Sequence, residues 1–484
     1  MICRRIVGLL GVLTLALAAG ALAVWDLLPK GPVVGTLDLG APISSLTLAP
    51  ADGRAFALSP TNSRVFVLDV RTATLARTLT APGSTFPLFR ARLAPETADG
   101  RIFLTDGATP QHLYAAVEEG SQALPLAALP LAGFDTYLAV DAAAHRLFAL
   151  SDAPPEGRLD IYDTRTQLPL PSTSLRWGNT PTNSVGVSDD TVPLAVDTPD
   201  ARVVAGHLGR PAVSIFDAVS GRIVATAPLD PSSPAGVSNA APSIAVDARF
   251  HRAYASLSDT GTVTTIDVSR DRALRTVQVG AAPTTPLVDE RTGRVIVASL
   301  GAVSVLDARS GALVRTTSST QTINHYPVAI DERSGAVYVA GFNGHTVDVF
   351  DGVSGRLRRS APVPGAPEAI AVDDATGRVL VVVGHQRALP QGTAAGATAL
   401  CALDGATGRL RRVLPLAVSA HARLYLDGRA RRALVLLDGV PRARQPDPWR
   451  WLPAWLRARL PLASAPIAAR PDATTVSVVD TTRL

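Results

Sequence analysis

The chain has 484 residues, of which 47% are hydrophobic and 18% charged, and it contains 38 glycines and 38 prolines. This composition predicts a folded chain with many turns and excludes a largely disordered one. The net charge of +5 comes mainly from arginines scattered along the sequence, without the long basic run of a nucleic-acid-binding segment. Binding to nucleic acid needs a clustered basic surface, so we expect no nucleic acid among the partners.

The N-terminus is predicted to direct export. Arg4 and Arg5 precede an uncharged apolar segment, residues 6–25, that is long enough to span a bilayer as a helix. The position of the two arginines places the rest of the chain outside the cytoplasm. The Ala-Leu-Ala sequence at 21–23 is typical of a cleavage site, so residues 1–28 form either a membrane anchor or a signal peptide. The first alternative predicts a membrane-anchored protein, and the second a secreted or periplasmic one.

A unit of about 42 residues repeats along the second half of the chain. Apolar segments that end in Asp247, Asp289, Asp331 and Asp373 follow one another at steps of 42 residues. After each Asp come a tight turn, a second apolar segment, a gap, a third segment that ends in Asp, and a fourth segment. Four short strands in each repeat of this length are typical of a β-propeller blade.

The tight turns share one chemistry. The pattern Asp-x-x-Ser/Thr-Gly begins at Asp217, Asp289, Asp307, Asp331, Asp351, Asp373 and Asp404. A short Asp side chain accepts hydrogen bonds from nearby backbone N–H groups, and glycine supplies the positive φ that closes the turn. We therefore interpret these aspartates as turn-forming residues.

Weaker copies of the unit in the first half bring the count to nine repeat units, which predicts seven to nine blades, with the second unit irregular or fused to a neighbour. The ninth unit ends after a third strand, residues 475–480. Residues 34–42 read like the fourth strand and its extension at 275–283. An N-terminal strand would thus complete the last blade and remove a sheet edge. The sequence predicts an all-β fold, a single closed β-propeller of four-stranded blades over residues 33–484.

These units resemble the YVTN-type β-propeller repeat family, found in exported bacterial and archaeal surface proteins. The family pattern is roughly Tyr-Val-x-Asn, then Thr-Val-Ser-Val-Ile-Asp, then a turn and Val-Gly-x-x-Pro. Residues 337–340, 346–351 and 277–283 match this pattern, although Gly341, Ser299 or Gly384 replaces the Asn. The resemblance implies the fold but no single activity, because such propellers serve as adhesins, assembly factors, ligand binders and a few enzymes.

Long connections are predicted to gather on one end of the propeller, which we call the elaborated face. They join second to third and fourth to first strands, whereas the turns on the opposite end, the tight-turn face, stay short. The long connections are residues 175–192, 228–243, 316–327, 385–398 and 439–474. Loops concentrated on one face predict a binding surface there.

The largest connection, residues 439–474, is a Trp-rich insertion within the last blade. Trp451 and Trp455 are four residues apart and follow Trp449, which predicts a short amphipathic helix. A lid over the end of the ring, a docking site for a partner and a membrane-surface helix all remain open. The N-terminal strand starts on the tight-turn face, so an anchor would direct this segment away from the bilayer.

Aromatic and imidazole side chains on the elaborated face are the candidate ligand- or partner-binding residues: Trp449, Trp451, Trp455, Trp177, His325, Tyr326 and His385. His207 and His345 belong to the same face, but the histidines come from different blades at unequal spacing, so no metal site is predicted. No cofactor motif and no catalytic motif is present. Cys401 lies in an apolar run and is predicted to be a buried thiol.

The expected function is that of a non-catalytic binding or scaffold module outside the cytoplasm, whose elaborated face recognises a protein, a glycan or a small ligand. The alternative is a propeller enzyme of the lactonase, lyase or dehydrogenase-subunit type. Propeller sites gather residues from distant blades, so missing local motifs exclude this alternative only weakly. Titratable groups that converge at the channel mouth would favour the enzyme, and an apolar or Gly/Ser-lined mouth would favour binding.

Overall fold

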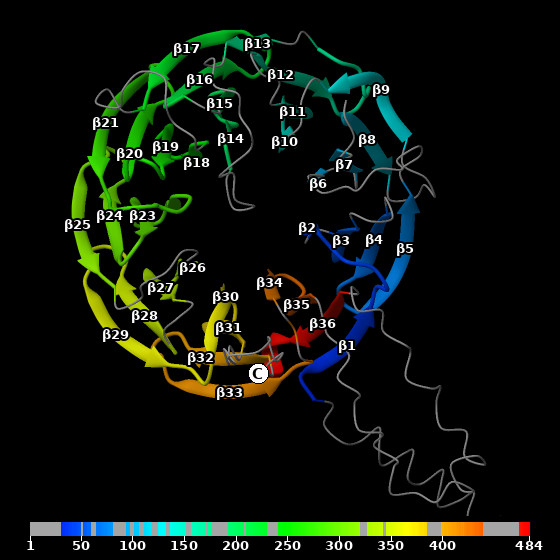
Figure 1. Cartoon of the computed structure of the whole chain (residues 1–484), viewed down its shortest axis with the longest axis vertical. Coiled ribbons are helices and arrows are strands. Elements are labelled where there is room, and N and C mark those ends of the chain that lie inside the picture. The colour runs from blue at the N-terminus through cyan, green and yellow to red at the C-terminus, as the bar shows by residue number, and fades with distance from the viewer. Residues whose placement is uncertain are drawn as a thin grey trace, which may run out of the picture.

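The computed structural model describes residues 31–49, 52–59, 64–80, 93–96, 101–105, 111–117, 124–131, 136–151, 156–170, 173–176, 192–207, 210–229, 241–319, 327–341, 345–384, 398–417, 419, 421–438 and 474–484. Within these ranges, the strands form nine four-stranded antiparallel sheets that follow one another around a common axis (Figure 1). This arrangement is a nine-bladed β-propeller.

Each blade is numbered by its place along the chain. Blade 1 consists of β2 (Ser45–Ala49), β3 (Arg54–Ser59), β4 (Arg64–Asp69) and β5 (Thr74–Thr80). Blade 2 consists of β6 (Leu93–Glu96), β7 (Arg101–Thr105), β8 (Gln111–Val117) and β9 (Leu124–Leu131). Blade 3 consists of β10 (Thr136–Asp141), β11 (Arg146–Ser151), β12 (Glu156–Asp163) and β13 (Thr173–Arg176). Blade 4 consists of β14 (Leu194–Asp197), β15 (Arg202–Gly206), β16 (Ala212–Asp217) and β17 (Ile223–Pro228). Blade 5 consists of β18 (Ser243–Asp247), β19 (Arg252–Leu257), β20 (Thr262–Asp267) and β21 (Arg272–Gln278). Blade 6 consists of β22 (Leu287–Asp289), β23 (Arg294–Ser299), β24 (Ala302–Asp307) and β25 (Leu313–Ser318). Blade 7 consists of β26 (Val328–Asp331), β27 (Ala336–Ala340), β28 (Thr346–Asp351) and β29 (Leu357–Pro362). Blade 8 consists of β30 (Ala366–Asp373), β31 (Arg378–Gly384), β32 (Ala399–Asp404) and β33 (Leu410–Pro415).

Blade 9 combines strands from both ends of the sequence. Its order is β34 (His421–Asp427), β35 (Arg432–Asp438), β36 (Thr475–Asp480) and β1 (Val33–Asp38). β1 pairs antiparallel with β36, and Thr36 lies opposite Ser477 in this register. A 3-10 turn, η1 (Thr481–Arg483), follows β36.

The nine repeat units counted in the sequence each form one blade. The second unit, expected to be irregular or fused to a neighbour, has a sheet of its own in the order β6-β7-β8-β9. Within its described residues, the register of β8 and β9 shifts between His112 and Tyr114.

The hydrophobic core is divided among the interfaces between blades. Central strands are apolar on both sides because both faces of each sheet pack against a neighbouring sheet; β35, for example, buries five successive residues. Nine clusters of buried side chains occur in the described chain, one for each pair of adjacent blades. One of them joins Leu434 and Leu436 of blade 9 to Leu46 and Phe66 of blade 1. Each blade therefore shares its core with the blades before and after it.

The aspartates act in the tight turns as the sequence predicts. Asp331 Oδ1 accepts hydrogen bonds from the backbone N–H groups of Arg333 and Ser334 at 3.0 and 3.2 Å, and Gly335 has a φ of 66°. The same Asx geometry recurs in other blades, for example at Asp307 with Ser310.

Arginines at the start of second strands add ion pairs beside these turns. In six described blades this arginine pairs with the Asp that ends the third strand, at N–O distances of 2.6 to 3.2 Å: Arg54–Asp69, Arg146–Asp163, Arg202–Asp217, Arg252–Asp267, Arg294–Asp307 and Arg432–Asp480. Partly exposed pairs of this kind each contribute at most about 1 kcal/mol. Their main effect is to fix the ends of three strands in one register.

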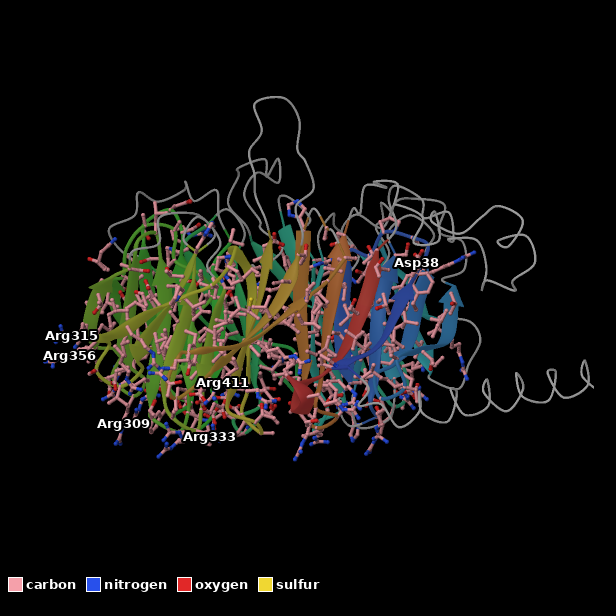
Figure 2. The ribbon with its side chains drawn as sticks, turned by 90° about the horizontal axis from the view of Figure 1, so that it is seen from below. Asp38, Arg309, Arg315, Arg333, Arg356 and Arg411 are labelled. Carbon is pink, nitrogen blue, oxygen red and sulfur yellow. The ribbon has the colours of Figure 1, made fainter. Side chains whose placement is uncertain are left out.

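The two ends of the propeller differ in what they expose. Figure 2 shows Arg309 and Arg333 at one end and Asp38, the last residue of β1, toward the other. The arginine end is the tight-turn face. No helix within the described ranges is long and apolar enough to cross a bilayer, and residues 6–25 lie outside them.

Candidate functional site

The innermost strands of the ring expose an almost wholly apolar surface toward its axis. They have no further strand on their inner side (Figure 1), and their central residues are only half-buried. These half-buried residues include Ala195, Val196, Val328, Ala329, Ile330, Ile370 and Val372. Most of this described lining is aliphatic, although Glu368 on β30 and His421 on β34 belong to the same inner strands.

A polar network interrupts this surface where blade 9 meets blade 1. Arg423, on β34, donates hydrogen bonds to the carbonyl oxygens of Ser44 and Ile43 at 2.7 and 2.6 Å. Its guanidinium also pairs with Asp438 at 2.7 Å. Thr474 Oγ1 donates to the other oxygen of Asp438 at 2.7 Å and accepts from the N–H of Ile43 at 3.0 Å. Arg423 therefore holds the backbone that leads into blade 1. Through Asp438 and its bond to Thr474, it also holds the end of β35 and the residue before β36.

A second polar contact lies between blades 8 and 9. Glu368, on β30, accepts a hydrogen bond from the N–H of Ala422 at 2.8 Å, and burial raises the pKa of its carboxyl group. Gly384, at the end of β31, lies against the Glu368 carboxylate, and a Cβ at this position would collide with it. His421 is exposed at the start of β34, next to the residue that Glu368 binds.

These contacts hold the bases of two of the expanded connections. The Trp-rich connection, residues 439–474, begins directly after Asp438 and ends at Thr474, and both residues belong to the Arg423 network. The connection 385–398 begins directly after Gly384, against Glu368. We call this set of side chains, Glu368, His421, Arg423, Asp438 and Thr474, the mouth cluster. It is the candidate functional site.

The site residues predicted from the sequence fall outside this cluster. Trp449, Trp451, Trp455, Trp177, His325, Tyr326 and His385 all lie outside the described residues. They remain predictions. The strands around them do support the predicted grouping of their connections, because second strands end and third strands begin at the end of the ring that carries Asp438 and Thr474.

The imidazole of His207 is buried and bonded within its own blade, so it is not placed to bind a ligand. Its Nε2 lies 2.8 Å from Ser214 Oγ within the same blade. Burial, and then the nearby charge of Arg210, lowers its pKa to about 4. His345 is exposed in blade 7, and neither imidazole belongs to a group of converging metal-ligand atoms among the described residues.

Cys401 is buried as predicted. Its side chain is fully enclosed in the core between blades 7 and 8, and burial raises the pKa of its thiol to about 12. A thiol in this state is neither a nucleophile nor a metal ligand at neutral pH.

A group of titratable side chains that the sequence did not predict lies on the opposite face. His251 Nδ1 lies 3.2 Å from Asp197 Oδ2 and 3.1 Å from Asp200 Oδ2. His251 comes from blade 5 and both aspartates from blade 4, and Asp200 also accepts a hydrogen bond from Ser269 Oγ at 2.5 Å. Burial raises the pKa of Asp197, and the imidazole partly offsets this effect. These bonds join blade 4 to blade 5, and we interpret the group as a structural contact between the two blades.

The mouth cluster carried a sequence signal that was overlooked. Arg423 and Glu368 are charged residues inside first strands that are otherwise mainly apolar. Charge in a segment that must line the axis of the ring marks a polar network. The His251 group left no comparable signal, because its members belong to two separate turns.

The chain is similar to solved structures at low sequence identity. Dihydro-heme d1 dehydrogenase NirN in complex with DHE is 13% identical over 83% of this chain and 83% of its own, with a TM-score of 0.50. BamB from Moraxella catarrhalis is 14% identical over 73% of this chain and 96% of its own, with a TM-score of 0.47. Sqt1 from Saccharomyces cerevisiae is 10% identical over 71% of this chain and 91% of its own, also with a TM-score of 0.47. At these identities the likeness to NirN shows the β-propeller fold alone.

No protein-family model matches the sequence, and no curated protein matches it either.

Proposed function

We propose that the chain is an extracytoplasmic binding or scaffold module of the YVTN-repeat type. In this proposal residues 1–28 anchor it to the membrane, residues 33–484 form the propeller, and the insertion 439–474 contributes to a binding surface on the elaborated face. The ligand is a protein, a glycan or a small molecule. The mouth cluster carries this proposal, because it holds the bases of two expanded connections in a fixed position beside an apolar inner surface.

The chemistry of the cluster supports binding rather than turnover. Arg423, Asp438 and Thr474 use their polar atoms on one another and on backbone groups of blade 1. A rigid base of this kind orients the loops above it, and binding surfaces are commonly loops held by a rigid scaffold. Tryptophan and arginine, which the insertion contains, dominate binding hot spots.

We also propose that β1 closes the ring. The pairing of β1 with β36 and the shared core of blades 9 and 1 support closure. With β1 in place, blade 9 has its full set of four strands, and no sheet edge is left open at the junction. The Arg423 network, which ties β34 to Ile43 and Ser44, adds polar contacts to the same junction.

Affinity purification of the full-length protein from its native membrane in mild detergent tests the binding role. A variant in which a short Gly-Ser linker replaces residues 442–472 keeps Asp438 and Thr474, and a matched variant carries the same linker in place of residues 387–396. We expect a stoichiometric partner that is lost only when 442–472 is replaced. If all three preparations are equally stable and carry no partner, the insertion is not a partner-docking segment.

The enzyme alternative is favoured by one observation at the mouth cluster. His421 is exposed beside Glu368, whose pKa is raised by burial, and an imidazole next to a carboxylic acid is a familiar pair for proton transfer. A panel of lactones and esters tests this alternative with the purified protein and its Glu368→Gln variant. Turnover that the substitution abolishes would replace the binding proposal with the enzyme.

A further inference from the structure

Exposed arginines crowd the tight-turn face. They occupy the described turns of blade 1 and of blades 3 to 9, and we call them together the arginine face: Arg71, Arg165, Arg222, Arg249, Arg270, Arg291, Arg309, Arg333, Arg356, Arg409, Arg429, Arg431 and Arg483. Figure 2 shows Arg309 and Arg333 projecting from this end, whereas Arg315 and Arg356 project sideways from the outer rim of the ring.

The carboxylates at this end are mostly buried or half-buried. The fully exposed acidic residues in the same described turns are Asp52, Glu290, Glu332 and Asp374. The half-buried aspartates that end third strands are paired with arginines, as Asp217 is with Arg202 and Asp307 with Arg294. The aspartates that end the first strands are buried and cap backbone N–H groups; Asp247, for example, binds the N–H groups of Arg249 and Phe250. Charges act over about 8–10 Å at physiological salt, so a surface that approaches along the propeller axis meets the arginines first.

Several of these arginines have no role in holding the fold. Arg249 and Arg291 donate to the carbonyl oxygens of Glu290 and Glu332 in the next blade, which explains their conformation. By contrast, the side chains of Arg309 and Arg356 form no hydrogen bond or ion pair with another described residue. Exposed guanidinium groups without internal partners are available to an external anion.

The path of the chain brings the N-terminal segment to this same face. β1 begins here, because Val33 lies opposite Val479, and the N–H of Asp480 donates to the carbonyl oxygen of Pro32 at 2.7 Å. The seven residues 26–32 separate this point from the apolar segment 6–25. Seven extended residues reach about 25 Å at most. An anchor in residues 6–25 therefore keeps the tight-turn face close to the bilayer surface.

We propose that the arginine face docks on the anionic headgroups of the bilayer leaflet from which residues 26–32 emerge. This inference rests on the proposed membrane anchor and adds an orientation to it: the propeller lies flat on the membrane, and the mouth cluster faces away. A bilayer fits better than a small anion or a nucleic acid, because the described arginines are distributed over eight of the nine blades and do not converge on one point or follow one groove. Each basic residue near an anionic surface changes the docking equilibrium by about five-fold.

The test uses the full chain in nanodiscs, with and without phosphatidylglycerol. Cys3→Ser removes one native thiol, and Cys401 is fully buried. A dye is then attached at Val353→Cys on the tight-turn face or at Leu300→Cys on the elaborated face, two positions that are each 45% exposed. Energy transfer to a headgroup-labelled lipid reports the distance of each face from the bilayer.

We expect transfer from position 353 to rise when phosphatidylglycerol is present and to fall at high salt, while transfer from position 300 stays low. The double variant Arg309→Gln and Arg356→Gln should lower the ratio of docked to undocked protein by about 20- to 30-fold. The matched double variant Arg64→Gln and Arg210→Gln, which neutralises two exposed arginines on the elaborated face, should leave the ratio unchanged.

Two failures are distinguishable. If the protein stays with the discs at high salt but transfer from position 353 ignores both phosphatidylglycerol and the Arg309 and Arg356 substitutions, the docking proposal is wrong and the anchor stands. If the protein leaves the discs at high salt, the anchor is wrong, and the docking proposal, which depends on it, is overturned as well.

Discussion

His207 is a buried imidazole that the protein keeps uncharged. Its side chain is 4% exposed, lies 2.8 Å from Ser214 Oγ and has a pKa lowered to about 4, first by burial and then by Arg210. The unfolded chain binds a proton at this residue below about pH 6.5, whereas the folded chain does not until about pH 4. The contribution of His207 to stability is therefore complete above about pH 6.5 and is lost as the pH falls toward 4.

Replacing His207 should flatten the pH dependence of stability. We expect the free energy of unfolding of the His207→Gln variant to fall less steeply between pH 6.5 and pH 4 than that of the wild type, by up to about 3 kcal/mol over this range. Denaturant unfolding at several pH values measures the difference. His345→Gln is the control, because His345 is exposed on the same face. Identical slopes for the wild type and His207→Gln would contradict the prediction.

Individual side chains divide into those that the sequence could predict and those that it could not. The turn aspartates and Cys401 were predictable, because local spacing or the apolar character of the neighbouring residues decides their environment. The contact of His251 with Asp197 was not, because it joins residues 54 apart whose proximity depends on how two blades stack. The seven candidate binding residues lie in expanded connections, where the repeat offers no template.

β1 is the element on which the organisation of the ring depends. It supplies the fourth strand of blade 9, and the cluster that joins blades 9 and 1 lies beside it, with Leu37 packed against that cluster. The sequence predicted this placement, because residues 34–42 resemble a fourth strand and the last unit lacks one. Strand assignments were most predictable in the second half of the chain, where each blade repeats the same apolar segments and Asp turns, whereas the first strands of blades 1 and 2 end in Ala49 and Glu96 instead.

A designed disulfide tests the pairing of β1 with β36. Thr36 and Ser477 are opposite one another, with their hydroxyl oxygens 3.5 Å apart. In a Cys3→Ser background, the pair Thr36→Cys and Ser477→Cys should oxidise readily and stabilise the propeller by up to about 5 kcal/mol, because the crosslink closes a very long loop. Non-reducing electrophoresis and denaturant unfolding measure both effects.

The control for this crosslink is a pair that is out of register. Asp38 lies opposite Thr475, two residues from Ser477. The pair Asp38→Cys and Ser477→Cys should therefore oxidise poorly and add little stability. Equal crosslinking of the two pairs would show that β1 is not held in this register.

At the scale of the whole molecule, adjacent blades of the propeller share their cores. The described structure has one buried cluster for every pair of adjacent blades, including blades 9 and 1. In a linear repeat protein, damage to one repeat is transmitted mainly to its neighbours. If β1 closes the ring as proposed, no blade is terminal, so loss of one interface weakens the support of all the others.

A core substitution in blade 9 should therefore lower the protection from hydrogen exchange in blades on the far side of the ring. Leu436 is fully buried in the cluster shared with blade 1, and Leu436→Ala should cost about 2–5 kcal/mol. Hydrogen exchange measured by mass spectrometry should show lower protection in β20 of blade 5 as well as in β35. Loss of protection confined to blades 8, 9 and 1 would indicate independent local unfolding instead.

The charge distribution shows how the ring changes the meaning of a sequence pattern. The arginines are scattered in the sequence, about one for each turn, and this scatter argued against a basic surface. The fold places the described tight turns at the same end of the molecule, so the periodic scatter becomes the arginine face. Periodicity in a repeat protein therefore concentrates charge in space without concentrating it along the chain.

The placement of β1 also has a consequence for the time course of folding. Thr36 is made early, but its partner Ser477 lies 441 residues further along the chain. At synthesis rates of about 5–20 residues per second, β1 waits roughly 20 to 90 seconds before the ribosome has made the strand that it pairs with. During this interval eight blades can form in order while one strand remains unmatched. If β1 closes the ring as proposed, its pairing with β36 is therefore among the last contacts that synthesis of the propeller permits.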